Sequence, residues 1–268
     1  MAQNKQRLDV LLLERGLFPS REQARAAIMA GEVLVDEVKT DKAGAAVKAD
    51  CQIRLLGQRL PYVSRGGLKL AKAIESFQLN LKDKVILDIG ASTGGFIDCA
   101  LQNGAAKVYG VDVGYNQLAW KLRNDPRVIS LEKTNARYLD RSVIDDDVDM
   151  LTADVSFISL TLALPAAIQH QLKPGGAIAV LIKPQFEAGR EAVGKGGVVR
   201  DKDTHRAVIE KIFAACAEWS LSIQGLDYSP ITGADGNIEY LLYAVKSALP
   251  AAEIDIDQVI EAAWTEHK

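Results

Sequence analysis

From residue 84 onward, short apolar runs alternate with segments of helical periodicity, and this alternation restricts the fold more than any other feature. Five apolar runs have the length of buried strands: residues 85–89, 108–111, 128–131, 149–153 and 177–182. Strands that alternate with helices predict a parallel sheet with helices on both faces. After a predicted helix at 201–218, two more strand-like runs, 221–228 and 238–245, are separated only by the turn-rich residues 229–237. This connection is too short for a crossover helix, so the last two strands should pair antiparallel.

The first 60 residues have a different pattern, that of a small α+β domain. Helical spacing of apolar residues predicts a helix at 7–14, and Ser20 with Gln23 forms a capping box that opens a second helix at 21–30. Short strands are expected at 33–35, near residue 38 and at 51–55. A segment rich in Gly, Pro and Arg at 57–67 predicts a domain junction near residue 60, followed by a helix at 68–77.

Charge and cysteine content limit the class of protein. Residues 1–82 hold 14 Lys and Arg against 9 Asp and Glu, a balance of +5, and the remainder holds 18 against 26, or −8. A basic front end on an acidic chain is a modest indication of a polyanionic partner. No secretory segment or bilayer-spanning run is visible, and the three cysteines are isolated, so we expect a cytoplasmic protein without a metal site. A monomer is favoured, and His170, His205 and His267 are expected at the surface or at helix ends.

A glycine-rich loop follows the first strand of the predicted sheet. It reads Asp88-Ile89-Gly90-Ala91-Ser92-Thr93-Gly94-Gly95-Phe96 and precedes a helix, which is where a doubly wound sheet binds a nucleotide-like ligand. The spacing is neither GxGxxG nor that of a phosphate loop, which disfavours a dinucleotide or a nucleoside triphosphate. Asp112, 22 residues after Gly90, can accept hydrogen bonds from a ribose. S-adenosylmethionine has a ribose and no pyrophosphate, so it suits this loop. The alternative is a turn that only packs a helix on a strand.

The sequence resembles the TlyA or haemolysin A family of ribosomal RNA 2'-O-methyltransferases, which is related to FtsJ. The motifs in order are SRGGLKL at 64–70, the loop at 88–96, GVDVG at 110–114, DPRV at 125–128, DVSFISL at 154–160, IKPQFE at 182–187 and GNIEY at 236–240. SREQA at 20–24 and GEVLV at 31–35 are similar to the RNA-binding domain of ribosomal small-subunit protein S-four, the alpha-L motif. The expected antiparallel hairpin is also typical of class I methyltransferases and distinguishes them from nicotinamide-binding Rossmann domains.

The resemblance implies an α/β fold: a class I, Rossmann-like methyltransferase domain with a mostly parallel seven-stranded sheet, preceded by a small α+β RNA-binding domain. Its implied boundaries are an RNA-binding domain at 1–60, a linker and first helix at 61–82, an FtsJ-like domain at 83–248 and a C-terminal helix or tail at 249–268. The implied partners are ribosomal RNA and ribosomal subunits, with cytidine in 16S and 23S RNA as the target.

The resemblance also implies site residues. The catalytic tetrad of the family corresponds to Lys69, Asp154, Lys183 and Glu239. For S-adenosylmethionine we expect contacts from Asp88, Gly90, Ala91, Ser92, Thr93, Gly94, Gly95, Phe96, Asp112, Val113 and Asp154. For RNA we expect contacts from Arg7, Arg21, Arg25, Arg65, Arg137 and Arg190.

The chemistry of ribose methylation suits this tetrad. A ribose hydroxyl is a poor nucleophile, and a lysine amine can take its proton only if the pKa of that amine lies well below about 10.4. Burial and a second cation both lower a lysine pKa. We therefore expect Lys183 to act as the base and Asp154 to orient it, while Lys69 and Glu239 position the ribose. Taken singly, each residue also has a structural explanation, such as a solvated charge or a helix N-cap.

Other functions fit less well. A Pro-Pro-Tyr/Phe signature of base amino-group methylation is absent after the fourth strand, and no cysteine is expected at a strand end for carbon-5 methylation. A membrane-active haemolysin should show membrane strands or a long apolar helix. A small-molecule methyltransferase would leave the basic front end without a purpose, and an RNA-binding protein with an inactive catalytic domain should have lost part of the tetrad. The glycine-rich residues 184–200, directly after Lys183, are expected to form a mobile lid or an unstructured connector.

Overall fold

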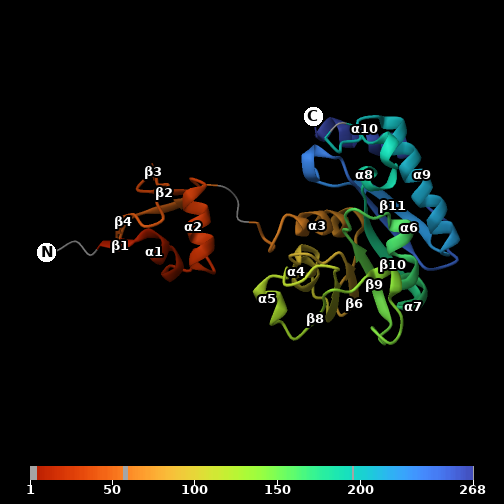
Figure 1. Ribbon diagram of the computed structural model, residues 1–268, viewed down its shortest axis with the longest axis horizontal. Helices are drawn as coiled ribbons and strands as arrows, with labels where there is room; N and C mark the ends of the chain where they lie inside the picture. The colour runs from red at the N-terminus through yellow and green to blue at the C-terminus, as the bar shows by residue number, and fades with distance from the viewer. Residues whose placement is uncertain (1–4, 57–59, 195, 268) are drawn as a thin grey trace. The chain divides into compact units, whose positions relative to one another are not determined.

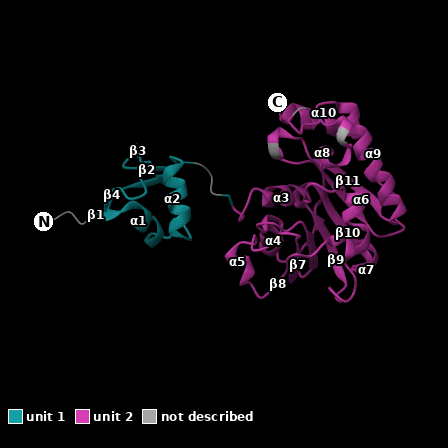
Figure 2. Ribbon diagram, in the orientation of Figure 1, with its two compact units in different colours: residues 1–60 teal, residues 61–268 magenta. Residues whose placement is uncertain are grey.

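The computed structural model describes residues 5–56, 60–194 and 196–267; the side chains of Arg190 and Ala234 are not described. The chain divides into two compact units, Met1–Leu60 and Pro61–Lys268, coloured separately in Figure 2. Each unit has a hydrophobic core of its own.

The first unit is the α+β domain that its sequence pattern predicts. Helices α1 (Leu8–Glu14) and α2 (Arg21–Met29) pack on a sheet of order β3-β2-β5, formed by Val38–Lys39, Val33–Val35 and Ile53–Leu55. The Ser20 hydroxyl accepts a hydrogen bond from the Gln23 backbone N–H at 3.3 Å and so caps α2. A second pair of strands, β1 (Lys5–Arg7) and β4 (Ala46–Lys48), was not predicted, because neither strand has an apolar alternation to reveal it.

The second unit is built on a seven-stranded sheet of order β11-β12-β10-β9-β6-β7-β8 (Figure 1). In chain order its strands are β6 (Val85–Ile89), β7 (Lys107–Val111), β8 (Val128–Leu131), β9 (Val148–Ala153), β10 (Leu172–Ile182), β11 (Ser222–Tyr228) and β12 (Tyr240–Val245). Neighbouring strands are parallel except for β12, which is antiparallel to both β10 and β11. The predicted class I sheet with a C-terminal hairpin is therefore confirmed.

Helices cover both faces of this sheet. On one face, α3 (Gly66–Phe77) and α4 (Gly95–Gln102) share a core with alternate strand residues such as Ile86 and Val108. On the other face, a larger core joins Leu87 and Leu151 to α6 (Leu160–Ala163), α7 (Pro165–His170), α9 (Lys202–Glu218) and α10 (Ile256–Glu266). Two short helices stand in the connections between strands: α5 (Trp120–Arg123) between β7 and β8, and α8 (Pro184–Glu187) between β10 and β11. Single 3-10 turns occur at Ala136–Tyr138, Arg190–Ala192 and Ala234–Gly236.

Strand β10 begins five residues before the predicted start at 177. Its register with β9 shifts between Leu172 and Ala177, where the Pro-Gly-Gly run interrupts the apolar pattern.

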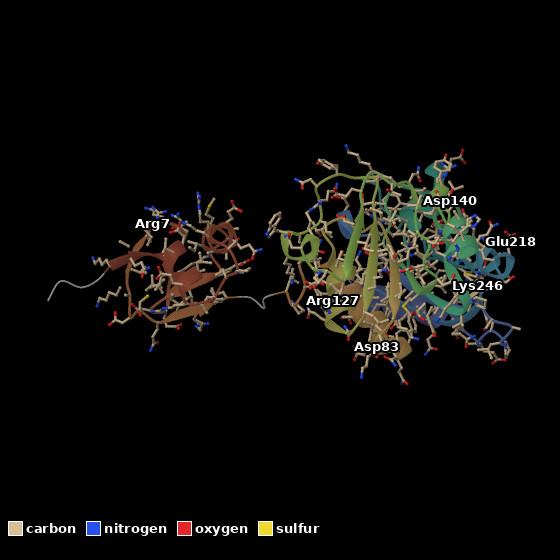
Figure 3. The ribbon with its side chains drawn as sticks, turned by 90° about the horizontal axis from the view of Figure 1, so that it is seen from below. Arg7, Asp83, Arg127, Asp140, Glu218 and Lys246 are labelled. Atoms are coloured by element: carbon tan, nitrogen blue, oxygen red, sulfur yellow. The ribbon has the colours of Figure 1, made fainter. Side chains whose placement is uncertain are left out.

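Charged side chains are mostly exposed, as the labelled Asp83, Arg127, Asp140 and Glu218 illustrate (Figure 3). Lysines and carboxylates that are buried are therefore exceptions, and several of them lie at one edge of the sheet.

Candidate active site

The strand directions bring three polar residues to the same edge of the sheet. Asp154 directly follows β9, and Lys183 directly follows the parallel strand β10. Glu239 directly precedes β12, which runs the opposite way, and Tyr240 pairs with Ile182. The start of β12 therefore meets the ends of β9 and β10. The antiparallel hairpin is what brings Glu239 to the two residues that follow parallel strands.

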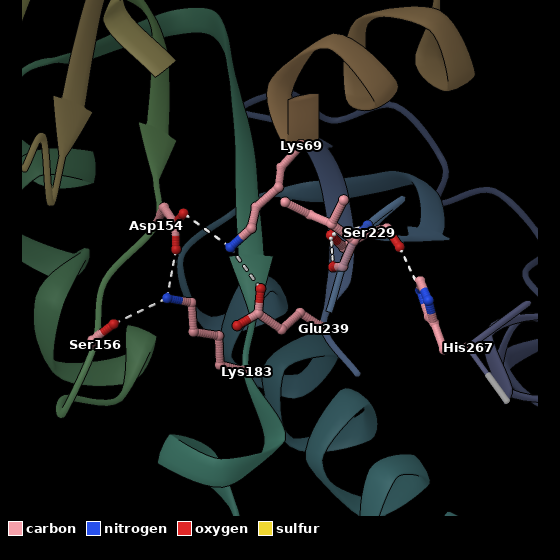
Figure 4. A network of polar contacts seen from close by, with 8 residues as sticks. Lys69, Asp154, Ser156, Lys183, Ser229, Glu239 and His267 are labelled. Carbon is pink, nitrogen blue, oxygen red and sulfur yellow. Dashed lines mark hydrogen bonds and ion pairs between the residues drawn. The ribbon is translucent and has the colours of Figure 1, made fainter. Parts of the chain in front are cut away.

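The fourth residue, Lys69, comes from the first turn of α3. This turn lies against the start of α4, and both helices have glycine at the point of contact: a Cβ added to Gly95 would lie 2.8 Å from the backbone nitrogen of Gly67. The close approach aims Lys69 at the sheet edge. Its amine donates hydrogen bonds to Glu239 Oε2 at 2.7 Å and to Asp154 Oδ2 at 3.2 Å (Figure 4).

Lys183 completes the cluster. Its Nζ lies 2.5 Å from Asp154 Oδ1 and donates a hydrogen bond to the Ser156 hydroxyl at 3.1 Å (Figure 4). Asp154 thus bridges the two lysines with its two oxygens. The structure brings together all four residues of the predicted tetrad.

Burial gives these contacts their strength. Lys69 and Lys183 are each 7% exposed and Glu239 is 2% exposed, so each charge depends on its partners rather than on water. Burial alone would raise the pKa of Asp154, but the two lysines hold this pKa below its ordinary value. Burial opposes the charge of Lys69 as well, yet Asp154 and Glu239 together raise the pKa of its amine above 10.5. Lys69 is therefore a fixed cation at neutral pH.

The glycine-rich loop adjoins the tetrad. Gly90 has φ +85°, and an added Cβ would lie 2.8 Å from the carbonyl oxygen of Asp154, so only glycine fits there. Gly94, with φ +93°, forms the turn into α4. Ala91, Ser92, Thr93 and Gly95 complete the same turn, whereas the side chain of Phe96 points into the core and is 5% exposed. Phe96 can therefore offer only its backbone to a ligand at the loop.

Asp88 lies below the loop, on the α3 and α4 face of the sheet. Its Oδ1 accepts a hydrogen bond from the Thr152 hydroxyl at 2.7 Å, while its buried Oδ2 has no partner among the described residues. Burial raises the pKa of this carboxyl to about 7. An incompletely paired buried carboxylate is costly without a cation or donor, so the site fits a positively charged ligand.

Asp112 organises the opposite side of the loop. Its Oδ2 accepts from the Ser92 backbone N–H and its Oδ1 from the Gly114 N–H, both at 2.7 Å. Each carboxylate oxygen can accept a further hydrogen bond. The neighbouring Val113 is 71% exposed. Asp112 is thus held in place with free lone pairs beside an exposed apolar side chain.

The arginines expected to contact RNA are distributed over both units. In the first unit, Arg7 and Arg21 converge on the buried Asp9 at 3.0 and 2.9 Å, and hydrogen bonds from Arg7 and Arg21 lower the pKa of Asp9 to about 2 despite its burial. Arg25 is exposed on α2. In the second unit Arg65 and Arg137 are exposed. The side chain of Arg190 lies outside the described part of the structure.

Several residues near the tetrad were not singled out from the sequence. Ser156 contacts Lys183, and the next residue, Phe157, is 90% exposed with φ +65°, an unusual conformation for a bulky side chain. Its ring lies 5.1 Å from that of Phe186, which in turn lies 5.8 Å from the Lys183 amine. Their positions, two and three residues after Asp154, were the available signal for Ser156 and Phe157.

The structure bears on two of the alternatives left open by the sequence. His205 lies in the first turn of α9, at a helix end, but it is not at the surface: it is 1% exposed, its Nδ1 lies 2.7 Å from the Tyr240 hydroxyl and its Nε2 lies 3.0 Å from the Val199 carbonyl. It lies on the inner face of α9, and the amphipathic pattern of this helix is too weak to predict the burial of His205. For residues 184–200, the alternative of a connector without structure is contradicted at both ends: the stretch begins with α8, and near its end the Val199 N–H donates a hydrogen bond to the Asn237 side chain at 3.3 Å. The mobile lid stays a prediction.

Two other features are absent from the described part of the chain. No group of three or more His, Cys, Asp or Glu side chains there could hold a metal ion. In the same residues, no helix is both long and apolar enough to cross a membrane.

Comparison with known proteins agrees with this geometry. The FtsJ-like methyltransferase family model matches residues 62–246, and the S4 domain model matches residues 6–53. The chain is 53% identical over 244 residues, 91% of this chain and 86% of the relative, to the Bacillus subtilis protein named "Putative rRNA methyltransferase YqxC". It is 42% identical over 238 residues, 88% of each chain, to the 16S/23S rRNA (cytidine-2'-O)-methyltransferase TlyA of Mycobacterium tuberculosis.

A solved structure from Streptococcus thermophilus, described as "Putative hemolysin", has 46% identity and a TM-score of 0.77, with 99% of this chain and 98% of that chain covered. Family model, sequence relatives and fold agree over both units of the molecule. The chain belongs to the FtsJ-like methyltransferase family and carries an S4 domain at its N-terminus.

Proposed function

We propose that this protein transfers a methyl group from S-adenosylmethionine to a ribose 2'-hydroxyl of ribosomal RNA, with cytidine as the target nucleotide. One observation carries the proposal: two buried amines, the buried Glu239 and the half-buried Asp154 converge beside the glycine loop, where a Cβ added to Gly90 would lie 2.8 Å from the carbonyl oxygen of Asp154. The relatives named as cytidine-2'-O-methyltransferases supply the target class.

The residues around the loop fit S-adenosylmethionine. When bound, this cofactor supplies an electrophilic methyl group and a positive charge. The carboxyl of Asp88, buried with one unpartnered oxygen, favours a cationic ligand. Asp112 has lone pairs available for ribose hydroxyls, and Val113 offers an exposed apolar surface for a flat base. The glycines allow the backbone to approach the ligand closely.

Within the tetrad the two lysines have different roles. Lys69 is held as a cation by two carboxylates, so it orients groups and balances charge rather than accepting a proton. Lys183 has one carboxylate partner, Asp154, and one neutral partner, Ser156, and we assign it the proton of the ribose hydroxyl. Asp154 then stabilises the protonated amine, since its own pKa is held low. Glu239 fixes Lys69 from the opposite side.

RNA recognition is assigned to the S4 domain together with exposed arginines of both units. Phosphate contacts from Arg and Lys give sequence-independent affinity, while the nucleotide is selected at the active site. Binding should therefore weaken steeply with salt, whereas the identity of the methylated nucleotide should not change.

The test uses purified full-length protein, labelled S-adenosylmethionine and isolated ribosomal subunits, with methylated riboses mapped by primer extension. The wild type should label 2'-hydroxyls, and Lys183→Met should abolish labelling while still binding the cofactor. Lys173→Met is the matched control, because Lys173 pairs with Asp149 at the opposite end of β9 and should keep full activity. Label on bases, or on no RNA at all, would refute the proposal.

A further inference from the structure

Another buried carboxylate, Glu187, lies close to the tetrad without belonging to it. It is 6% exposed and ends helix α8, four residues after Lys183. Its Oε1 accepts a hydrogen bond from the Leu160 backbone N–H at 2.6 Å, and its Oε2 accepts from the Ser159 hydroxyl at 2.5 Å. Lys211 of α9 supplies a cation at 3.1 Å from the same oxygen. Both oxygens of Glu187 are thus occupied by the segment that follows β9.

Glu187 provides the second of two contacts that join two neighbouring loops. One loop, residues 154–160, follows β9, and the other, residues 183–187, follows β10. At their start the loops are joined by Lys183, which contacts Asp154 and Ser156. At their end they are joined by Glu187, which contacts Ser159 and Leu160. Between the two joints the rings of Phe157 and Phe186 are in contact.

The first loop needs an external restraint. Phe157 is almost fully exposed and has φ +65°, so its own side chain contributes little burial to hold a strained backbone. The Lys183 side chain has four rotatable methylene groups, and its amine direction is set by Asp154 and Ser156. A shift of this loop would therefore move Ser156 and release the Lys183 amine.

We propose that Glu187 is a positioning residue for the methyl-transfer reaction: by fixing Ser159 and Leu160 it keeps Ser156 and Asp154 in place around the Lys183 amine. The inference rests on the proposed role of Lys183 as the base. Glu187 touches no reacting group itself. Misplacement of a catalytic group by about 1 Å can reduce a rate about 100-fold, so loss of this restraint should lower the rate of the chemical step.

The experiment compares Glu187→Ala, Glu187→Gln and Asp149→Ala in the full chain. Asp149 is the matched control, because its carboxylate accepts the Val85 backbone N–H at 2.8 Å and pairs with Lys173, but at the far end of β9. Single-turnover methylation of ribosomal subunits at saturating cofactor measures the chemical step, and calorimetry measures cofactor affinity. Thermal unfolding reports the folded fraction at the assay temperature.

Glu187→Ala should lower the single-turnover rate roughly 10- to 100-fold, with cofactor affinity within about twofold of the wild type, because in the described structure no hydrogen bond or ion pair joins Glu187 to the loop from Gly90 to Gly95. Glu187→Gln should restore most of the rate, since its amide oxygen can still accept from Leu160. Asp149→Ala should lose stability and keep its rate per folded molecule. Equal rates for Glu187→Ala and Asp149→Ala, or no rescue by Gln, would overturn the proposal.

Hydrogen exchange separates this inference from the proposed function. In Glu187→Ala the amides of residues 156–160 should exchange faster than in the wild type and in Asp149→Ala. If the wild type methylates no ribose, the proposed function fails, and this exchange still tests the restraint. If exchange at these amides is unchanged, the restraint does not exist.

Discussion

Replacement of Lys69 by methionine should lower the free energy of unfolding, because the Lys69 amine balances the negative charge of Glu239 and Asp154. Methionine matches the lysine stem in volume but removes the amine that bonds Glu239 at 2.7 Å and Asp154 at 3.2 Å. Asp154 keeps Lys183 as a partner. Glu239, 2% exposed, has no other cation within ion-pair distance among the described residues.

The magnitude follows from burial. Removing one partner of a buried pair costs about 3–5 kcal/mol, because the remaining charge is left uncompensated. For a domain of about 150–250 residues, each kcal/mol lowers the unfolding temperature by about 2–4 °C, so Lys69→Met should unfold roughly 10 °C below the wild type. The double variant Lys69→Met with Glu239→Gln should recover about half of this loss, since only a neutral amide remains unpaired at a cost of about 1–3 kcal/mol.

The assay is urea unfolding of the wild type, both single variants and the double variant at pH 7.5. A double variant that is less stable than Lys69→Met, or a Lys69→Met variant that is as stable as the wild type, would refute the view that Glu239 depends on Lys69.

Three further predictions concern the loop and the buried titratable groups. Gly90→Ala should lower cofactor affinity at least about tenfold by calorimetry, since an added Cβ would meet the Asp154 carbonyl at 2.8 Å, whereas Gly175→Ala, with φ +74° and open space, should keep it. Cofactor binding at pH 7 should release protons, because a cation favours the ionised form of Asp88, and the pKa of this carboxyl is about 7 without the cofactor. Proton release is measured as a dependence of the binding heat on the buffer. Asp88→Asn should abolish the release, and an unchanged release would exclude Asp88 as its source. Burial lowers the pKa of His205 below its unfolded value of about 6.5, so the unfolded chain binds more protons and the unfolding free energy should fall as the pH drops from about 7 to 5. In urea unfolding the variant His205→Gln should show a flatter dependence, and an equally steep one would contradict the assignment.

Sequence periodicity was sufficient for the sheet of the second unit, because buried parallel strands such as β6 and β7 are short, mostly apolar runs with clear ends. Asp154 and Lys183 were identified through the family resemblance, and the strand pattern added only that each of them stands at the end of a predicted strand. Strands β1 and β4 could not be predicted, because they are polar and are defined only by pairing with each other. The burial of His205 and the anchoring of Glu187 depend on contacts with residues distant in the sequence, which no local pattern records.

The antiparallel strand β12 also has a consequence for how the molecule matures during synthesis. Lys69 and Glu239 are 170 residues apart in the chain, and their contact forms only once the final hairpin has joined the sheet. A ribosome that has made residues up to 230 has already produced the glycine loop, Asp154 and Lys183, but not the carboxylate that anchors Lys69. Completion of the charge cluster therefore waits for the last part of the domain to emerge, so that a nascent or prematurely terminated chain holds the glycine-rich loop before it holds the complete tetrad.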